Sequence, residues 1–360
     1  MPLDHYVTLG RSGLRVSPFC LGAMTFGEDL GWGASVKESQ TILDRYLDLG
    51  GNFIDTANGY TKGHSEKILG DHIGHDREKR DRLVIATKFS ANLYPGDPNG
   101  GGSNRKSVIA ACEQSLRRLR TDYIDLYWLH NWDKHTPIEE TMAALHDLVR
   151  SGKVRYIGVS DTPAWKVAQA QLIAQFRGWT PFIGLQIEYS LLERTVEGEL
   201  IPMARELGLG VTPWSPLRSG LLSGKYTRQN AGTLTPDREW MTPQLNDKTY
   251  EVVDALARVA SELDTTVARV ALAWMRARPG VSSTIIGTRT LAQLDDNVKA
   301  LEVQLTAEHT ATLDKLTTPQ LPFPIEFLRM APSLHAGGTT VNGEASQLYP
   351  HGVTKKGDHY

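Results

Sequence analysis

Residues 124–160, IDLYWLHNWDKHTPIEETMAALHDLVRSGKVRYIGVS, contain two strand-like runs separated by a helical pattern. Ile124–His130 and Val154–Ser160 are short runs rich in β-branched and aromatic residues, which are typical of strands. Ile138–Ser151 between them has helical periodicity, and we expect Thr136-Pro137 to supply its N-cap and first helical residue. A strand, a helix and a strand with short connections predict a parallel pair of strands joined by a crossover helix.

The same alternation extends along most of the chain. The predicted strands are Phe19–Gly22, Asn52–Thr56, Leu83–Lys88, Ile124–His130, Val154–Ser160, Ile183–Glu188, Gly210–Ser215 and Ser283–Gly287. The predicted helices are Lys37–Leu49, Ser65–Ile73, Lys106–Leu119, Ile138–Ser151, Ala164–Gln175, Glu197–Glu206, Thr249–Leu263, Val267–Arg278 and Leu291–Leu301. Eight such units predict an α/β protein with a (β/α)₈ TIM barrel, because eight is the number that closes this barrel.

An open, doubly wound sheet is the alternative fold. Such sheets commonly carry the fingerprint G-x-G-x-x-G between a strand and a helix, and no such motif occurs here. Ser219–Tyr226 (SGLLSGKY) matches a P-loop only in part, since it lacks the first glycine and the Ser/Thr after the lysine. The barrel is therefore favoured, with a predicted N-terminal β-hairpin over Tyr6–Val16 that turns at Ser12-Gly13.

Three segments are too long for tight connections: Ser90–Asn104, Pro216–Asp247 and the residues after about Leu305. Loops that follow barrel strands lie on the catalytic face, so we expect the first two there. We assign the barrel to residues 1–318. Residues 319–360 are expected to form a C-terminal extension, an ordered wrap with a partly mobile end.

Composition and charge limit the classes of function. The 360 residues are 40% hydrophobic and carry a formal net charge of -2, so no basic footprint indicates nucleic acid or an anionic membrane. The sequence has no signal-peptide pattern and no apolar run near the roughly 20 residues of a membrane span. We expect a cytoplasmic protein, monomeric or homo-oligomeric, with Cys20 and Cys112 as core residues rather than a disulfide.

Ionisable residues follow apolar runs at the ends of neighbouring predicted strands. Asp55, Lys88 and His130 end the second, third and fourth strands, and Tyr60 follows the second. Each alone has an ordinary structural explanation, such as a loop cap or a satisfied core residue. Together they form an acid: a nearby lysine lowers a tyrosine pKa from about 10, the aspartate keeps the lysine charged, and the histidine orients the substrate oxygen.

These motifs resemble the aldo-keto reductase superfamily, especially its bacterial aryl-alcohol-dehydrogenase-like and potassium-channel-β-subunit-like members. Asn52–Tyr60 (NFIDTANGY) with Gly63–Glu66 (GHSE) is similar to the family's Asp/Tyr signature, Ile85–Lys88 (IATK) to its lysine strand and Asp125–His130 (DLYWLH) to its histidine strand. The resemblance runs from about Tyr6 to Leu301. It implies an NADP(H)-dependent reductase of aldehydes and ketones that uses no metal, with the catalytic residues Asp55, Tyr60, Lys88 and His130.

The resemblance also implies where the cofactor, NADPH, binds on the barrel rim. Ser160, Asp161 and Gln186 match the residues that hold the nicotinamide carboxamide, and Trp214 matches the aromatic residue that stacks on the ring. Asp161 stands where asparagine or arginine is common; it can still accept a hydrogen bond from the amide, but it adds a negative charge. The other implied contacts are Gly22, Ala23, Met24, Asp55, Ser215, Pro216, Leu217, Ser219, Gly287, Thr288, Gln293, Asp296 and Asn297.

Two basic residues favour NADPH over NADH. Arg289 and Lys225 match the family's contacts to the 2′-phosphate, which NADPH has and NADH lacks. Arg238, in the long loop after the seventh strand, is a third candidate.

The substrate pocket is predicted from loop position alone. Trp32, Tyr94, Trp132 and Phe327 are the candidates for apolar walls, which would suit small-molecule aromatic or bulky carbonyl substrates. Two other function classes stay open. One is a cofactor-sensing subunit that binds NADPH and a partner with little turnover, and the other is a metal-dependent barrel hydrolase that uses Asp55 and His130.

Overall fold

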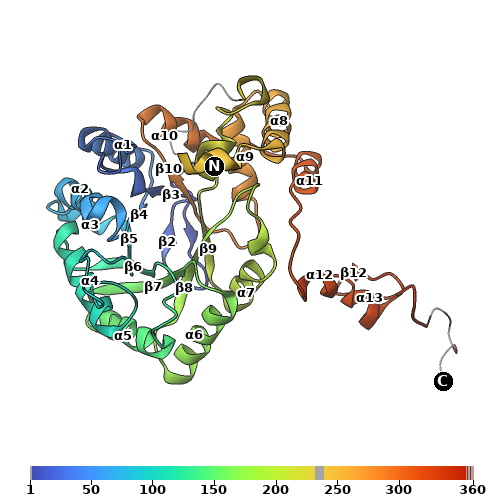
Figure 1. Ribbon diagram of the computed structural model, residues 1–360, viewed down its shortest axis with the longest axis horizontal. Coiled ribbons are helices and arrows are strands. Elements are labelled where there is room, and N and C mark those ends of the chain that lie inside the picture. The colour runs from blue at the N-terminus through green and yellow to red at the C-terminus, as the bar shows by residue number, and fades with distance from the viewer. Residues whose placement is uncertain (1, 232–238, 354, 356, 358–360) are drawn as a thin grey trace.

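The predicted strands pair in parallel into one sheet in the order β10-β3-β4-β5-β6-β7-β8-β9. The structure is a computed structural model that describes residues 2–231, 239–353, 355 and 357. The strands are β3 (Phe19–Gly22), β4 (Phe53–Asp55), β5 (Val84–Phe89), β6 (Ile124–Leu129), β7 (Val154–Ser160), β8 (Phe182–Glu188), β9 (Gly210–Trp214) and β10 (Thr284–Gly287). Val211 of β9 donates to the Gly280 carbonyl (3.0 Å) and accepts from the Ser282 amide (2.9 Å), which joins β9 to the segment before β10. The sheet thus curls into the predicted TIM barrel (Figure 1).

Helices surround the strands (Figure 1). They are α1 (Val36–Asp48), α2 (His64–Ile73), α3 (Arg77–Asp81), α4 (Arg105–Leu119), α5 (Ile138–Arg150), α6 (Ala164–Arg177), α7 (Leu200–Leu207), α8 (Asp247–Glu262), α9 (Val267–Arg276), α10 (Leu291–Val298) and α11 (Ala307–Leu316). Helix α5 begins one residue later than predicted, because Pro137 and not Thr136 is its N-cap. Thr136, one residue before this cap, donates from Oγ1 to Asp133 Oδ2 at 2.6 Å.

The N-terminal hairpin closes one end of the barrel. Its strands β1 (Val7–Thr8) and β2 (Arg15–Val16) pair antiparallel, as predicted. Leu9 and Val16 are fully buried and pack among the residues that fill the barrel interior. The Arg11 amide donates to the Gly208 carbonyl (2.7 Å), just before β9 begins. The hairpin therefore covers the amino ends of the strands and leaves their carboxyl ends for a site.

Trp128 of β6 is the largest side chain in the barrel interior. A Cβ atom on Gly158 of β7 would lie 2.3 Å from its ring, and one on Gly184 of β8 would lie 2.9 Å away. Glycine on the two following strands thus makes room for one large indole. Cys20 and Cys112 are both buried and free, as predicted.

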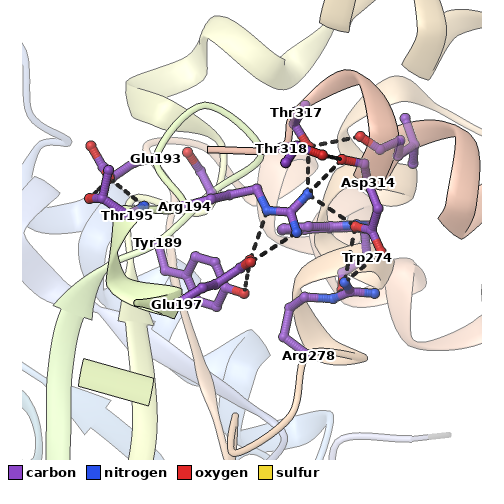
Figure 2. Close-up of polar contacts among 12 residues, drawn as sticks. Tyr189, Glu193, Arg194, Thr195, Glu197, Trp274, Arg278, Asp314, Thr317 and Thr318 are labelled. Carbon is purple, nitrogen blue, oxygen red and sulfur yellow. Dashed lines mark hydrogen bonds and ion pairs between the residues drawn. The ribbon is translucent and has the colours of Figure 1, made fainter. Parts of the chain in front are cut away.

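An ion-pair network fixes α11 to the barrel (Figure 2). Arg194, in the loop after β8, pairs with Glu197 (2.7 Å) and donates to Asp314 of α11 (3.2 Å). Asp314 also accepts from Trp274 Nε1 of α9 (2.9 Å) and from Arg278 Nη1, two residues after α9 ends (3.0 Å). The indole of Trp274 lies between the two guanidinium groups, a favourable cation–π arrangement.

Beyond α11 the chain leaves the barrel instead of wrapping it, contrary to expectation (Figure 1). This extension contains α12 (Ile325–Leu328), α13 (Ala331–Ala336) and a small hairpin of β11 (Thr340–Val341) with β12 (Glu344–Ala345). Its large apolar side chains, such as Phe323 and Phe327, are exposed. No helix within the described residues has both the length and the apolarity that a membrane span needs.

Candidate active site

The strand register brings Asp55 and Lys88 together. Asp55 at the end of β4 is opposite Ala86 of β5, and Lys88 lies two residues further along β5, on the same side of the strand. Lys88 Nζ contacts Asp55 Oδ2 and donates to Tyr60 Oη and to the Thr56 carbonyl, both at 2.9 Å. Lys88 and Asp55 are buried, so their opposite charges compensate each other in a dry environment.

Tyr60 is held by a strained turn between β4 and α2. The Asn58 amide donates to the Lys88 carbonyl at 3.0 Å, which ties the turn to β5. Thr61 and Lys62 follow with φ angles of 46° and 60°, in the left-handed region that such residues rarely adopt. Thr61 Oγ1 accepts from the Ser65 amide (2.9 Å) and donates to the Phe26 carbonyl (3.2 Å). Strain held in this way is typical of functional sites.

Glu66 supports the same corner, and the sequence reasoning did not assign it a role. Its buried carboxylate accepts from Thr87 Oγ1 (2.5 Å), next to Lys88 in the chain, and from Arg118 Nε (2.7 Å). These bonds fix α2 against β5 and α4. Glu66 could have been identified from the sequence, because it is an ionisable residue within the apolar pattern of a helix, and a buried charge needs a partner.

His130 lies beside Tyr60. Their ring centroids are 5.7 Å apart and the rings are nearly perpendicular. Burial, helped by the positive charge of Lys88, lowers the pKa of His130 to about 3. The imidazole is therefore neutral near pH 7 and can donate one hydrogen bond without carrying a charge.

The pKa of Tyr60 moves against expectation. Burial raises the pKa of the Tyr60 hydroxyl, and the opposing effect of Lys88 does not overcome it. Lys88 is itself in contact with Asp55, whose negative charge also acts to raise the pKa of Tyr60. Burial alone would lower the pKa of Lys88, but the charges of Asp55 and Tyr60 raise it above its ordinary value. Lys88 thus stays charged, and Tyr60 stays protonated.

These residues form one end of a large cavity of about 800 Å³. The predicted residues that line it are Gly22, Met24, Asp55, Tyr60, His130, Asp161, Gln186, Trp214, Ser215, Pro216, Leu217, Ser219, Lys225, Gly287, Arg289, Gln293, Asp296 and Asn297. Four others are buried behind its wall: Ala23, Lys88, Ser160 and Thr288. Arg238 lies outside the described residues.

Several lining residues were not predicted. They are Thr25, Gly220, Ser223, Tyr226, Ala268, Leu272, Ile285, Ile286 and Ala292. Those in the loop after β9 lie between predicted positions, so the whole loop could have been predicted to line the cavity. Ala268 and Leu272 belong to α9, whose apolar spacing indicates only a buried face.

The loop after β9 forms one wall of the cavity. Ser215, Arg218 and Ser219 have left-handed φ angles of 53°, 46° and 55°. Ser215 Oγ accepts from the Ser219 amide at 2.9 Å, and Arg218 pairs with Glu188 at the end of β8. The loop is therefore strained and firmly held, as the Tyr60 turn is.

The far end of the cavity is basic. Arg289 and Lys225 line it, and the Arg289 amide donates to Gln293 Oε1 at 2.8 Å in the first turn of α10. The N-terminus of a helix carries a partial positive charge, which favours an anion. Thr288 Oγ1 is buried here without a hydrogen-bond partner among the described residues.

Asp161 and Gln186 lie near the Tyr60 end. Gln186 Nε2 donates to Asp55 Oδ1 at 3.0 Å, and the Asp161 amide donates to the Gln186 carbonyl at 3.3 Å. Trp214 Nε1 donates to Asp161 Oδ1 at 3.1 Å. The three residues predicted to surround one flat ring thus contact one another across β7, β8 and β9.

None of the four aromatic residues predicted for the substrate pocket lines this cavity. Tyr94 lines a separate cavity of about 230 Å³ beneath the loop after β5. The Trp132 ring packs on Trp165, 5.6 Å between centroids, and the Trp32 carbonyl accepts from Arg289 at 3.5 Å, so both lie beside the site. Phe327 belongs to the extension that leaves the barrel, which corrects its expected position.

The metal-dependent hydrolase alternative needs a cluster of side chains that can ligate a metal. Across the described part of the chain, no three His, Cys, Asp or Glu side chains are grouped so that they could hold a metal ion.

Comparisons with known proteins match nearly the whole barrel. Residues 18–318 match the Aldo/keto reductase family. An uncharacterised oxidoreductase of Bacillus subtilis is 42% identical over 313 residues, which cover 84% of this chain and 93% of the relative. Norsolorinic acid reductase of Emericella nidulans is 38% identical over 339 residues (91% and 85%). An aryl-alcohol dehydrogenase of Pestalotiopsis microspora is 36% identical over 331 residues (90% and 85%).

Proposed function

The chain belongs to the aldo/keto reductase family, and we propose that it is an NADPH-dependent reductase of aldehydes and ketones whose proton donor is Tyr60. One observation carries the proposal: Lys88 Nζ contacts both the Asp55 carboxylate and Tyr60 Oη at the end of an 800 Å³ cavity. A phenol hydrogen-bonded to a buried ammonium is poised to lose a proton to a stronger base, because the ammonium stabilises the phenolate that remains.

The protein groups divide the chemistry of carbonyl reduction. The bound reduced nicotinamide supplies the hydride that reaches the carbonyl carbon. Tyr60 transfers its proton to the carbonyl oxygen, and Lys88 stabilises the resulting phenolate through its 2.9 Å hydrogen bond. His130, neutral at working pH, donates a hydrogen bond that orients the same oxygen. The raised pKa keeps the Tyr60 hydroxyl protonated near neutral pH, and transfer of its proton stays favourable because an alkoxide is a stronger base than a phenolate.

The cavity fits a dinucleotide. It is large enough for an elongated ligand, and Arg289, Lys225 and the start of α10 line the end where phosphates would lie. Trp214 and Gln186 would hold the nicotinamide, and the loop from Ser215 to Ser219 would follow the pyrophosphate. Arg289 and Lys225 would pair with a 2′-phosphate, which favours NADPH over NADH.

We infer that the substrates are aromatic or bulky apolar carbonyl compounds. One relative is named an aryl-alcohol dehydrogenase, a name that indicates aromatic alcohols, and another is named a norsolorinic acid reductase. The rim beside Asp161 carries the paired indoles of Trp132 and Trp165, which provide apolar contact surface.

The test uses purified protein, NADPH and a panel of aromatic aldehydes and ketones. Reduction should consume NADPH, and Tyr60→Phe should nearly abolish it while NADPH affinity stays close to normal. Tyr6→Phe removes an exposed hydroxyl that bonds the Gly50 carbonyl, so it is the matched control and should be fully active. Retained activity in Tyr60→Phe would overturn the proton-donor assignment. Tight NADPH binding without turnover would support the sensor alternative, and chelator-sensitive hydrolysis the hydrolase.

A further inference from the structure

Asp161 is a carboxylate at the Tyr60 end of the cavity that has no ion-pair partner among the described residues. The other carboxylates at this end are paired, Asp55 with Lys88 and Glu188 with Arg218. In the part of the chain that the structure describes, no cation forms an ion pair with Asp161. Its side chain nevertheless lines the cavity. A charge kept in a ligand site without a countercharge indicates that the ligand supplies one.

The backbone and a neighbouring indole fix this carboxylate in place. Asp161 has a φ angle of 40°, in the left-handed region, and its amide and carbonyl bond Gln186 (3.3 Å) and Trp132 (3.5 Å). Trp214 Nε1 holds one carboxylate oxygen at 3.1 Å. Trp214 also lines the cavity, so the carboxylate lies beside a flat aromatic wall where a planar ring would stack.

The two ends of the cavity therefore differ in charge. Arg289, Lys225 and the start of α10 place cationic groups at one end, and Asp296 at that end is paired with Arg269 at 2.6 Å. Asp161 makes the Tyr60 end negative. An oxidised nicotinamide dinucleotide has the complementary distribution, with phosphates at one end and a cationic ring at the other. The reduced form has the same phosphates but a neutral ring.

We propose that the Asp161 carboxylate is the countercharge of the oxidised nicotinamide ring, so that the chain binds NADP⁺ more tightly than NADPH. This inference rests on the proposed function and extends it to the charge of the ring. Positive charge develops on the ring as the hydride leaves, and Asp161 stabilises that charge more in the transition state than in the reduced ground state. The carboxylate acts through its field and exchanges no proton.

Coulomb's law sets the size of the effect. Opposite unit charges about 6 Å apart, at an effective dielectric constant of ~20, change binding about a hundredfold. Solvent at the cavity mouth weakens this, so removal of the charge should cost NADP⁺ at least about tenfold in affinity relative to NADPH.

The test compares the Kd values of NADP⁺ and NADPH by titration calorimetry at pH 8, without substrate. Wild type should bind NADP⁺ more tightly. Asp161→Asn keeps an oxygen for Trp214 but removes the charge, and should shift the ratio of the two Kd values toward NADPH by at least about tenfold. Asp161→Glu should keep the wild-type preference. Asp122→Asn, which removes an equal charge from an exposed site paired with Arg77, should leave the ratio unchanged.

The outcomes separate this inference from the proposed function. If both nucleotides bind and Asp161→Asn leaves their ratio unchanged, the countercharge is refuted and the reductase proposal stands. If Asp161→Asn fails to fold, wild type still decides, since equal or tighter binding of NADPH overturns the inference. If wild type binds neither nucleotide, the proposed function fails and this inference fails with it.

Discussion

His130 should make the fold sensitive to acid, and this sensitivity can be measured without any substrate. Its pKa is about 3 in the folded protein and about 6.5 in an unfolded chain. Between these values the unfolded state binds a proton that the folded state does not, so stability is lost as the pH falls. From pH 7 to pH 5 the loss attributable to His130 is about 2 kcal/mol.

His130→Asn removes the titrating group and keeps a hydrogen-bond donor. Urea unfolding at pH 7 and pH 5 should show that the variant loses about 2 kcal/mol less than wild type over this interval. His135→Asn, at an exposed position on the same loop, should lose as much as wild type. Equal losses in wild type and His130→Asn would refute the reasoning, because His130 would then be able to accept a proton in the folded state and could act as an acid.

Four further predictions concern the site and the barrel. Lys88→Met should cost about 3–5 kcal/mol in unfolding free energy by leaving Asp55 buried and unpaired, and adding Asp55→Asn should restore most of it; no recovery in urea melts would contradict the pairing. Arg289→Ala should raise the Kd of NADPH about tenfold or more but hardly change that of NADH; equal weakening would mean that the 2′-phosphate is bound elsewhere. The rate of reduction should stay constant as the pH rises through the ordinary tyrosine value of about 10, since burial raises the pKa of Tyr60; an earlier alkaline fall would argue against it. Gly158→Ala should cost at least ~2 kcal/mol by forcing a methyl group into Trp128, whereas Gly13→Ala, with open space around it, should be nearly neutral in the same melts.

The barrel could be predicted because its strands are encoded locally. Each is a short run of β-branched and aromatic residues, and the length of the helical pattern that follows leaves a parallel crossover as the natural connection. The exact ends of helices are harder to predict, because they depend on local hydrogen bonds in the flanking loops. Thr136 was expected to cap α5, but Pro137 is the N-cap, and the Thr136 hydroxyl donates to the Asp133 carboxylate three residues earlier. Which residue caps the helix depends on the geometry of the loop before it.

The site could be predicted in its membership but not in its electrostatics. Asp55, Lys88 and His130 end neighbouring strands, and the carboxyl ends of barrel strands converge, so their proximity follows from topology. The direction of the Tyr60 pKa shift does not follow from topology. It depends on whether the attraction of Lys88 exceeds the cost of burying a phenolate, and the negative charge of Asp55 beside Lys88 opposes that attraction. Two opposing effects on one pKa cannot be ranked without the burial and the distances that the structure supplies.

The aromatic residues proposed for the substrate pocket lie outside the large cavity, whereas Asp161 lines it, and the difference follows from their places in the chain. A loop residue such as Tyr94 can face either side of its loop, and here it faces the small cavity beneath it. Asp161 directly follows β7, so its position is set by the strand before it and by the Gln186 carbonyl on the next strand. Residues within one step of a barrel strand inherit the precision of the sheet, and those in the middle of a long loop do not. The residues at the barrel end can therefore be placed from the sequence through the strands that they follow.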